Sequence, residues 1–464
     1  MTTMTRTFAG MLCATIAIGS LAPMAAAQPL TAERAVEIAL TRNSQIVTSA
    51  ADVLDARSGV YGAASGMLPR VTASVSRSGA FTDNQSLRAG EVRFVGGKLV
   101  SGPGTIDVES YSTSPSLSGS WSILDLSAIS SFSAARQGVK AANLRRTSAR
   151  HDVALETRRR FYDVVKAVHL SSVASGALRV ARDDERRVRA LFEVGSVAKS
   201  DLLKAQVRTA QSEFDSLSSS QSVTVTRVNL AQQIGLPESE LGAVDTVLTA
   251  EPRSYDEGAL LEEASRNRPD LKAAEAELRA ANGGVTASRL ARLPYVTVSG
   301  DVTFNPRSTQ TATIAGFDSV GAPSVAQSGS VSQSDREWRG AVALNLDIFD
   351  GFGKDSRAAS ARARQIRARE SRDALQRNLA SEVHATVLTY QEAIERDRVA
   401  RRAVESATEN LNLTQQKYNV GSATILELID AEVQLQRAHS DAVSALAAMR
   451  VAEAFIERVR GSGN

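Results

Sequence analysis

The stretch YNVGSATILELIDAE, Tyr418 to Glu432, repeats a phrase that the chain has already used at FEVGSVAKSDLLKAQ, Phe192 to Gln206. Both phrases place Val-Gly-Ser between two stretches that have helical composition. Glycine supplies the backbone freedom that a tight reversal between helices requires. The pair therefore predicts two helical hairpins that turn at Gly195 and Gly421.

The duplication extends over most of the chain. GMLPRVTAS at 66–74 aligns without a gap with ARLPYVTVS at 291–299. Each copy has the order helix, Leu-Pro, strand, loop, strand, long helix, turn and helix. We therefore expect a first structural repeat over 28–250, with its hairpin tip at about 192–200, and a second over 251–464, with its tip at about 418–424.

The residues that follow each Leu-Pro alternate between apolar and polar, as in YVTVSGDVTF at 295–304. A period of two is typical of strands with two different faces. We expect four strands, at 71–80, 115–124, 294–304 and 337–349. Gly/Ser/Thr-rich loops are expected between the members of each pair, at 82–113 and 305–336.

The remaining residues favour helices. The stretches 126–192 and 353–418 lack proline, and each predicts a helix about 100 Å long. Helices about half as long are expected at 31–66, 200–235, 256–291 and 424–460. Two short helices placed end to end are about as long as one long helix. We therefore expect a bundle in which stacked short helices pair with the long ones.

An apolar seven-residue period supports coiled-coil packing in these helices. One set of heptad positions comprises Val383, Tyr390, Val404, Leu411 and Tyr418. Two further sets in the last helix comprise Leu428, Leu435, Ala442, Met449 and Ile456, and Ala431, Ala438, Ala445 and Ala452.

The first 27 residues have the features of a secretory signal peptide. Arg6 is their only charge, an apolar run extends from Met11 to Leu21, and an Ala-x-Ala cleavage site ends at Ala27. Cys13, the only cysteine, lies in this segment, so we expect a mature chain without disulfides or thiol chemistry.

Composition excludes several functions. A net charge of +3 is too small to indicate a nucleic-acid partner. The four histidines have no metal-ligand spacing, and no catalytic or phosphate-binding motif occurs. We expect neither an enzyme nor a bound cofactor.

Four strands cannot close a barrel, and bacterial membrane barrels begin at eight strands. If the strands cross a membrane, several copies must therefore share one barrel, and three copies would supply about twelve strands. The alternative is a small periplasmic sheet that packs one face on a helix.

In the order of its repeats and in its two VGS phrases, the chain resembles the TolC-type outer-membrane efflux protein family. The resemblance implies a mainly α fold with a β-barrel part. Each protomer would contribute four transmembrane strands and long coiled-coil helices to a homotrimer, which would share a twelve-stranded barrel and an α-helical periplasmic tunnel.

The resemblance also implies a function and partners. Such a channel-tunnel, in contact with outer-membrane lipid, is the exit duct of a tripartite efflux pump or a type I secretion system. It would bind a periplasmic adaptor (membrane fusion) protein and an inner-membrane transporter of the RND or ABC type. The alternative is a soluble periplasmic coiled-coil adaptor or scaffold, which predicts one hairpin flanked by β-domains.

The second hairpin carries the candidate gate. Glu427 and Asp430 are three residues apart and therefore lie on one helix face. Threefold symmetry would make this face a carboxylate ring whose crowding raises the pKa values and whose charge favours cations. Without such a ring, the two residues would be solvated acids at a helix end.

The resemblance implies that Tyr418 and Asp201 take part in holding the entrance closed. Ala423 occupies a position where the best-studied family pattern has arginine. We therefore expect the closing contacts of this chain to differ from that pattern.

Overall fold

The structure is a computed structural model that describes residues 29–87, 92–95, 98–101, 104–305, 307–317, 323–325, 329–331 and 335–461. The expected signal peptide at 1–27 lies outside the described residues. Within these ranges, every helix is too short or too polar to cross a membrane.

The helices occur in pairs of matching length, one from each half of the chain. The first half contains α1 (Ala32–Arg42), α2 (Ser44–Ser65), α3 (Leu126–Glu193) and α4 (Lys199–Ile234). The second half contains α5 (Glu257–Asn267), α6 (Pro269–Leu290), α7 (Gly353–Asn419) and α8 (Ile425–Arg460). The long helices have 68 and 67 residues, and α4 and α8 have 36 each. In each half, the three shorter helices together match the length of the long helix.

The expected single helices at 31–66 and 256–291 are each broken in two, and this part of the prediction was wrong. The first break is at Asn43 (ψ 135°), whose side-chain amide donates to the Gln233 carbonyl at 2.7 Å. The second is at Arg268 (ψ 122°), which precedes Pro269. Proline disfavours helical backbone at the residue before it. Asn43 and Arg268 are 225 positions apart, the spacing of the repeat, so the two breaks are equivalent.

Each break receives the end of a 36-residue helix. Gly235 follows α4 with φ 72°, and a Cβ added there would lie 2.9 Å from the Arg42 carbonyl oxygen. Gly461 follows α8 with φ 72°, and its Cβ would lie 3.0 Å from the Arg268 nitrogen. Both positions thus require glycine for its backbone conformation and for its small size.

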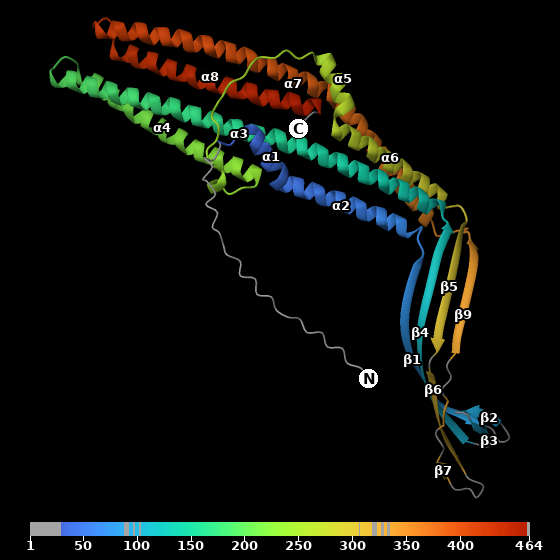
Figure 1. Ribbon diagram of the computed structural model, residues 1–464. Coiled ribbons are helices and arrows are strands. Elements are labelled where there is room, and N and C mark those ends of the chain that lie inside the picture. Colours follow the sequence, from blue (N-terminus) through green and yellow to red (C-terminus); the bar gives the residue numbers. More distant parts are fainter. Residues whose placement is uncertain are drawn as a thin grey trace, which may run out of the picture. The chain divides into compact units, whose positions relative to one another are not determined.

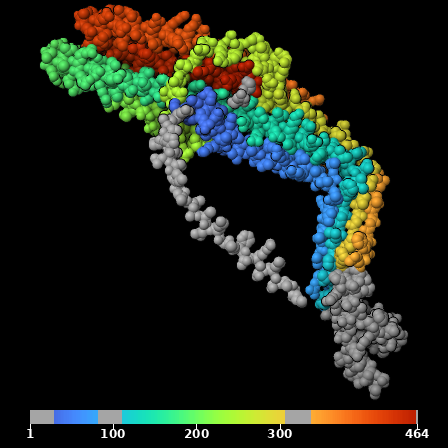
Figure 2. Space-filling model, viewed as in Figure 1, coloured from blue at the N-terminus to red at the C-terminus, as the bar shows by residue number. Residues whose placement is uncertain are grey.

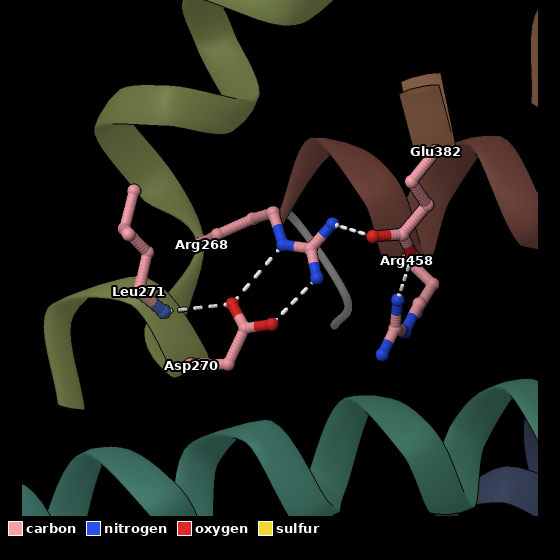
Figure 3. A network of polar contacts seen from close by, with 5 residues as sticks. All are labelled: Arg268, Asp270, Leu271, Glu382 and Arg458. Atoms are coloured by element: carbon pink, nitrogen blue, oxygen red, sulfur yellow. Dashed lines mark hydrogen bonds and ion pairs between the residues drawn. The ribbon is translucent and has the colours of Figure 1, made fainter. Parts of the chain in front are cut away.

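The second break is also held by buried ion pairs (Figure 3). The Arg268 side chain is 8% exposed and donates through Nε to Asp270 at 3.0 Å and through Nη1 to Glu382 of α7. Arg458 of α8 pairs with the same Glu382. Burial by itself raises the pKa of Asp270, but the hydrogen bonds and charge of Arg268, with the Leu271 N–H, hold this pKa below its usual range. Three helices therefore meet at one ionised network.

Four long strands form an antiparallel sheet in the order β1 (Arg70–Leu87), β4 (Gly104–Leu124), β5 (Tyr295–Asn305) and β9 (Asp335–Asn345) (Figure 1). They correspond to the four expected strands. The turn between α2 and β1 is tied by the Trp121 indole, which donates to the Met67 carbonyl at 2.8 Å.

One face of this sheet is apolar. Val298 of β5 pairs with Trp121 of β4 on one side and with Val342 of β9 on the other. Trp338, Val342 and Leu344 of β9 are 72%, 74% and 72% exposed in the single chain. Cross-strand neighbours project from the same side of a sheet, so these side chains form one continuous exposed apolar surface.

The opposite face is polar. The hydroxyls of Ser74 and Ser116 lie 2.8 Å apart across β1 and β4. Arg339 of β9 approaches Asp301 of β5 at 4.0 Å. The two faces therefore differ in polarity over all four strands.

The stretches expected to be loops, 82–113 and 305–336, contain strands, and this expectation was wrong. β4 begins at Gly104, and its first half pairs with β6 (Arg307–Phe317). Short strands also occur, namely β2 (Val92–Val95), β3 (Lys98–Ser101), β7 (Pro323–Val325) and β8 (Gly329–Val331). The Thr and Ile residues of RSTQTATIAGF at 307–317 favour strand over the loop that their polarity suggested.

β9 ends at Asn345, earlier than the expected 349. The residues that follow cap the start of α7. The Asp350 carboxylate accepts from the Lys354 N–H at 2.8 Å, which satisfies a donor of the first helical turn.

The chain forms two compact units, and each takes segments from both halves of the sequence. One comprises the described parts of 1–44, 152–254 and 386–457, which include the hairpin ends. The other comprises 45–151, 255–385 and 458–464, again where described, and it includes the strands.

The predicted heptad positions supply much of the helical core. Val383, Leu428, Met449 and Ile456 are fully buried, and Tyr390 is 1% exposed. The four alanines of the other predicted position are also buried, namely Ala431, Ala438, Ala445 and Ala452. Small side chains at one position of the repeat allow helices to approach closely.

We expect Arg268→Ala to lower the free energy of unfolding by about 3 kcal/mol at pH 7. Removal of one member of a buried ion pair leaves its partners uncompensated, and Asp270 and Glu382 keep some contact with water, which places the loss at the lower end of the range. Denaturant unfolding followed by helical circular dichroism measures the change.

Arg266→Ala is the matched control, because Arg266 is exposed and pairs only within α5. The loss in Arg268→Ala should shrink as pH falls below about 3.8, since a carboxylate with a lowered pKa contributes stability above its ordinary pKa and loses it on protonation. Equal unfolding midpoints for the two variants at pH 7 would contradict the role of the network.

Candidate functional site

Both hairpins turn through the same backbone motif. Gly195 and Gly421 adopt φ 76° and 77°, and no atom lies within 4 Å of a Cβ added at either position. The N–H groups of Ser196 and Ser422 donate to carbonyls five residues earlier, at 2.8 and 2.9 Å. This is the Schellman arrangement of a helix end. The Val-Gly-Ser phrase is therefore required by backbone conformation rather than by lack of space.

The two hairpin ends pack against each other through a small apolar cluster. Val188 of α3 and Ala205 of α4 contact Ile425 and Leu428 of α8, and all four are buried. Tyr418, in the last turn of α7, packs on this cluster. Figure 2 shows the green first hairpin and the orange-red second hairpin side by side in this region.

The second hairpin resumes its helix through a capping box. The Glu427 carboxylate accepts from the Thr424 N–H at 2.6 Å and from its hydroxyl at 3.1 Å. In return, the Glu427 N–H donates to the Thr424 hydroxyl oxygen at 3.3 Å. Two helix-terminal donors are thus satisfied reciprocally, and the Glu427 carboxylate is held at the turn.

The first hairpin uses the equivalent positions differently. Ala198 stands at the N-cap of α4 and makes no side-chain cap. Asp201 pairs with Lys204 at 3.1 Å, so the charge of this acid is balanced on its own helix. Within the described chain, neither Glu427 nor Asp430 has an ion-pair partner, and only the second hairpin has uncompensated acids at its start.

Hydrogen bonds from the Thr424 backbone and hydroxyl lower the pKa of Glu427, and the charge of Lys417 adds to this effect. In the single chain, the capping box therefore acts against the rise in pKa that we expect from crowding in a ring. Both effects must be considered when Glu427 is placed in an assembly.

Glu427 and Asp430 line one polar groove between α7 and α8, of about 900 Å³. Asp430 accepts from Gln434 one turn further along α8 at 2.6 Å. Ala423 also lines this groove, together with Lys417. The two predicted acids therefore share a surface, as their spacing indicates.

Tyr418 and Asp201 lie on the other side of the hairpin end. Burial raises the pKa of the Tyr418 hydroxyl; Arg187 opposes this effect, while Asp184 and Asp201 reinforce it. The charge of Asp201 thus affects the pKa of Tyr418, although Asp201 forms an ion pair with Lys204. Neither residue lines the α7–α8 groove.

Sequence reasoning missed two features of this region. Thr424 could have been found, since Thr-x-x-Glu before an apolar run is a capping-box signal. The buried carboxyls Asp184 and Glu432 could not, because burial of an acid has no local sequence signal. In the residues that the structure describes, no group of His, Cys, Asp and Glu could hold a metal ion.

Comparison with known proteins gives one family match, and it occurs twice. The model of the outer membrane efflux protein family matches residues 35–236 and again 260–462. The outer membrane protein TolC of Vibrio cholerae is 22% identical over 364 residues, which are 78% of this chain and 80% of that protein. The outer membrane protein OprJ of Pseudomonas aeruginosa is 30% identical over 166 residues, which are 36% of this chain and 31% of that protein.

Solved structures share the fold. The CmeC outer membrane channel of Campylobacter jejuni superposes with a TM-score of 0.75 at 15% identity, over 93% of this chain and 86% of that one. The MtrE outer membrane channel of Neisseria gonorrhoeae, in its open state, superposes with a TM-score of 0.70 at 20% identity, over 93% and 89%.

The fold, with a duplicated helical hairpin and a strand sheet, is that of outer-membrane channel-tunnels. The chain belongs to the outer membrane efflux protein family. It is an exit duct of efflux systems in the outer membrane, with a periplasmic tunnel. The alternative of a soluble adaptor or scaffold does not hold, since the family match covers both repeats.

We expect Thr424→Ala to weaken the start of α8 by about 1 kcal/mol, because the capping box loses its hydroxyl. Backbone amide exchange at residues 425–428 should become about fivefold faster. The reciprocal variant Ala198→Thr should slow exchange at the start of α4. Unchanged exchange in both variants would show that the capping box does not stabilise the turn.

Proposed function

We propose that three copies of the chain assemble into one duct, with a shared twelve-stranded barrel and a tunnel formed by their helices. The observation that supports this proposal is the apolar face of the β1-β4-β5-β9 sheet, which is exposed in the single chain. Family channels are homotrimers, which supports this assembly. The proposal also includes the two repeats, 28–250 and 251–464, each of which contributes two long strands and one hairpin.

The apolar face would contact outer-membrane lipid. Val342→Lys or Leu344→Lys should cost about 2–4 kcal/mol near the membrane midplane and reduce the yield of assembled trimer. Ala343→Lys is the control, because Ala343 projects from the opposite face of β9, between these two residues. The yield of trimer on gels without heating measures the effect. Equal yields for the three variants would contradict this orientation of the strands.

The α7–α8 groove near the second hairpin would line the periplasmic entrance. Glu427 and Asp430 lie together on this surface, and neither forms an ion pair in the described chain. Three copies would place six carboxylates around one axis. Such a ring favours cations over anions.

Tyr418 and Asp201 would contribute to holding the entrance closed. Tyr418 packs on the cluster that joins the two hairpins, and Asp201 lies on the helix next to it. Ala423 provides no donor where the family pattern has arginine. Closure in this chain would therefore depend more on apolar packing around Leu428 than on a charged bond at position 423.

The hairpin ends, with the turns at Gly195 and Gly421, would receive a periplasmic adaptor (membrane fusion) protein. Transport energy would come from an inner-membrane transporter of the RND or ABC type. Family channels work with such adaptors and transporters in tripartite pumps, which supports these partners. The chain would have no catalytic role, no cofactor and no nucleic-acid partner.

The test of the entrance is single-channel recording of the purified protein in a planar bilayer. We expect Glu427→Gln/Asp430→Asn to lose the cation preference of the wild type and to retain its assembly. Gln keeps the oxygen acceptor of the capping box, so this variant separates charge from helix capping.

Glu409→Gln is the control that removes a carboxylate outside the groove, since Glu409 is exposed on α7 and does not line the groove. It should keep the wild-type preference. Pores with unaltered ion preference in the double variant would leave the duct intact and remove the acidic entrance from the proposal.

A further inference from the structure

A pair of buried carboxyl groups lies where the two hairpins pack together, and its role below rests on the proposed function, in which the hairpin ends form the entrance. Asp184 belongs to α3 and is 8% exposed, and Glu432 belongs to α8 and is 9% exposed. Asp184 lies nine residues before the end of α3 at Glu193, and Glu432 lies seven residues after the start of α8 at Ile425. The pair therefore lies beside the apolar cluster that joins the hairpin ends.

The cations near this pair do not neutralise it fully. Arg187 approaches one oxygen of Asp184 at 3.5 Å, while the other oxygen, Oδ2, is buried without a hydrogen-bond donor. Arg208 of α4 donates to Gln436 at 2.9 Å. No ion pair reaches Glu432 anywhere in the described chain. One hydrogen-bond donor is thus missing between the carboxyl groups of Asp184 and Glu432.

A proton on Glu432 would supply that donor. Burial is the main cause that raises the pKa of Glu432 to about 8; the hydrogen bond that a protonated Glu432 can donate to Asp184 and the negative charge of Asp184 add to it. The charges of Arg208 and Arg187 act in the opposite direction and do not outweigh these effects. Two adjacent buried carboxyls cannot both ionise without strong repulsion.

We propose that Asp184 and Glu432 share one proton, and that this proton ties the first hairpin to the second and is released as pH rises. While the proton is bound, α3 and α8 are joined by a short carboxyl–carboxylate hydrogen bond. Once it is lost, two negative charges face each other across the helix contact. The shared proton would then favour a closed entrance, and its loss would favour opening.

The other charged and titratable groups around the pair come from all four helices. Arg179 and Arg187 belong to α3, Arg208 to α4, Tyr418 to α7 and His439 to α8. The arginines stay charged throughout the relevant range. The raised pKa of Tyr418 keeps this hydroxyl neutral there. His439 lines the same cavity as Glu432, and it is removed in a control below.

A cavity of about 330 Å³ reaches Glu432. It is lined by Glu432 and Arg208 at its polar end and by apolar side chains such as Leu411 and Leu435. Polar atoms at one end of a space of this size can hold water. Protons can therefore exchange with Glu432 without separation of the helices.

The direction of the pH effect follows from the sign of the shift. The ordinary pKa of Glu432 is 4.5, and the folded value is about 8. The folded chain binds more protons than the unfolded chain between these values, so its stability falls as pH rises through this window. Contact between the hairpins should weaken most as pH passes about 8.

The first test is infrared difference spectroscopy of the intact trimer between pH 6 and pH 9, roughly one to two units either side of the folded pKa. We expect a protonated-carboxyl band that disappears over this range in the wild type and is absent in Glu432→Gln. This measurement does not depend on any channel function. Absence of the band in the wild type at pH 6 would overturn the shared proton.

The second test is the open probability of single channels over the same pH range. The wild type should open more often as pH rises. Glu432→Gln keeps a donor toward Asp184 and should stay closed at every pH. Asp184→Asn removes the neighbouring charge and should move the midpoint to lower pH.

His439→Gln and Glu409→Gln are the controls and should retain the wild-type profile. If Glu432→Gln keeps the pH dependence, or if His439→Gln abolishes it, the carboxyl pair does not control the entrance. A wild type whose opening is independent of pH, with the infrared band present, would leave the shared proton in place and overturn its role in opening.

Discussion

The fold depends on a joint that occurs once in each repeat, where the end of a 36-residue helix meets a break between two shorter helices. In each repeat, three shorter helices together match the length of one helix of nearly 70 residues, provided that their ends abut. At Asn43 and at Arg268 the backbone turns extended, and Gly235 and Gly461 allow it to approach without side-chain interference.

The two joints share geometry and differ in chemistry. The first uses a neutral hydrogen bond, from Asn43 to the Gln233 carbonyl. The second uses the ionised group of Arg268, Asp270, Glu382 and Arg458. A charged network can connect more helices than one amide can, since an arginine side chain has five hydrogen-bond donors in a fixed geometry. The repeat therefore conserves the position of the break, while each copy stabilises it separately.

Sequence patterns predicted the periodic features of the helices, but they missed the places where a helix breaks or an expected loop forms a strand. The seven-residue period placed Leu428, Met449 and Ile456 in the core, where each is fully buried. The break at Arg268 was missed although Pro269 signals it, because the flanking residues favour helix on both sides. The break at Asn43 has no such signal, since its cause is a partner 190 residues away. The strands within 305–336 were missed because pairing, rather than composition, decides whether a Thr-rich stretch becomes strand.

Candidate site residues were predictable where they depend on helix phase, and not where they depend on burial. The spacing of Glu427 and Asp430 sufficed to place both in one groove. Nothing local distinguishes Glu432, two residues further along α8, which turns inward and is buried against α3.

One helical turn of α8 thus carries acids in two environments. Asp430 faces the groove, where water can solvate a negative charge, and Glu432 faces the other hairpin, where a negative charge is costly. Because both residues belong to one helix, their positions cannot change independently. Helix phase alone therefore places one acid at the solvated groove and the other at the contact between the hairpins.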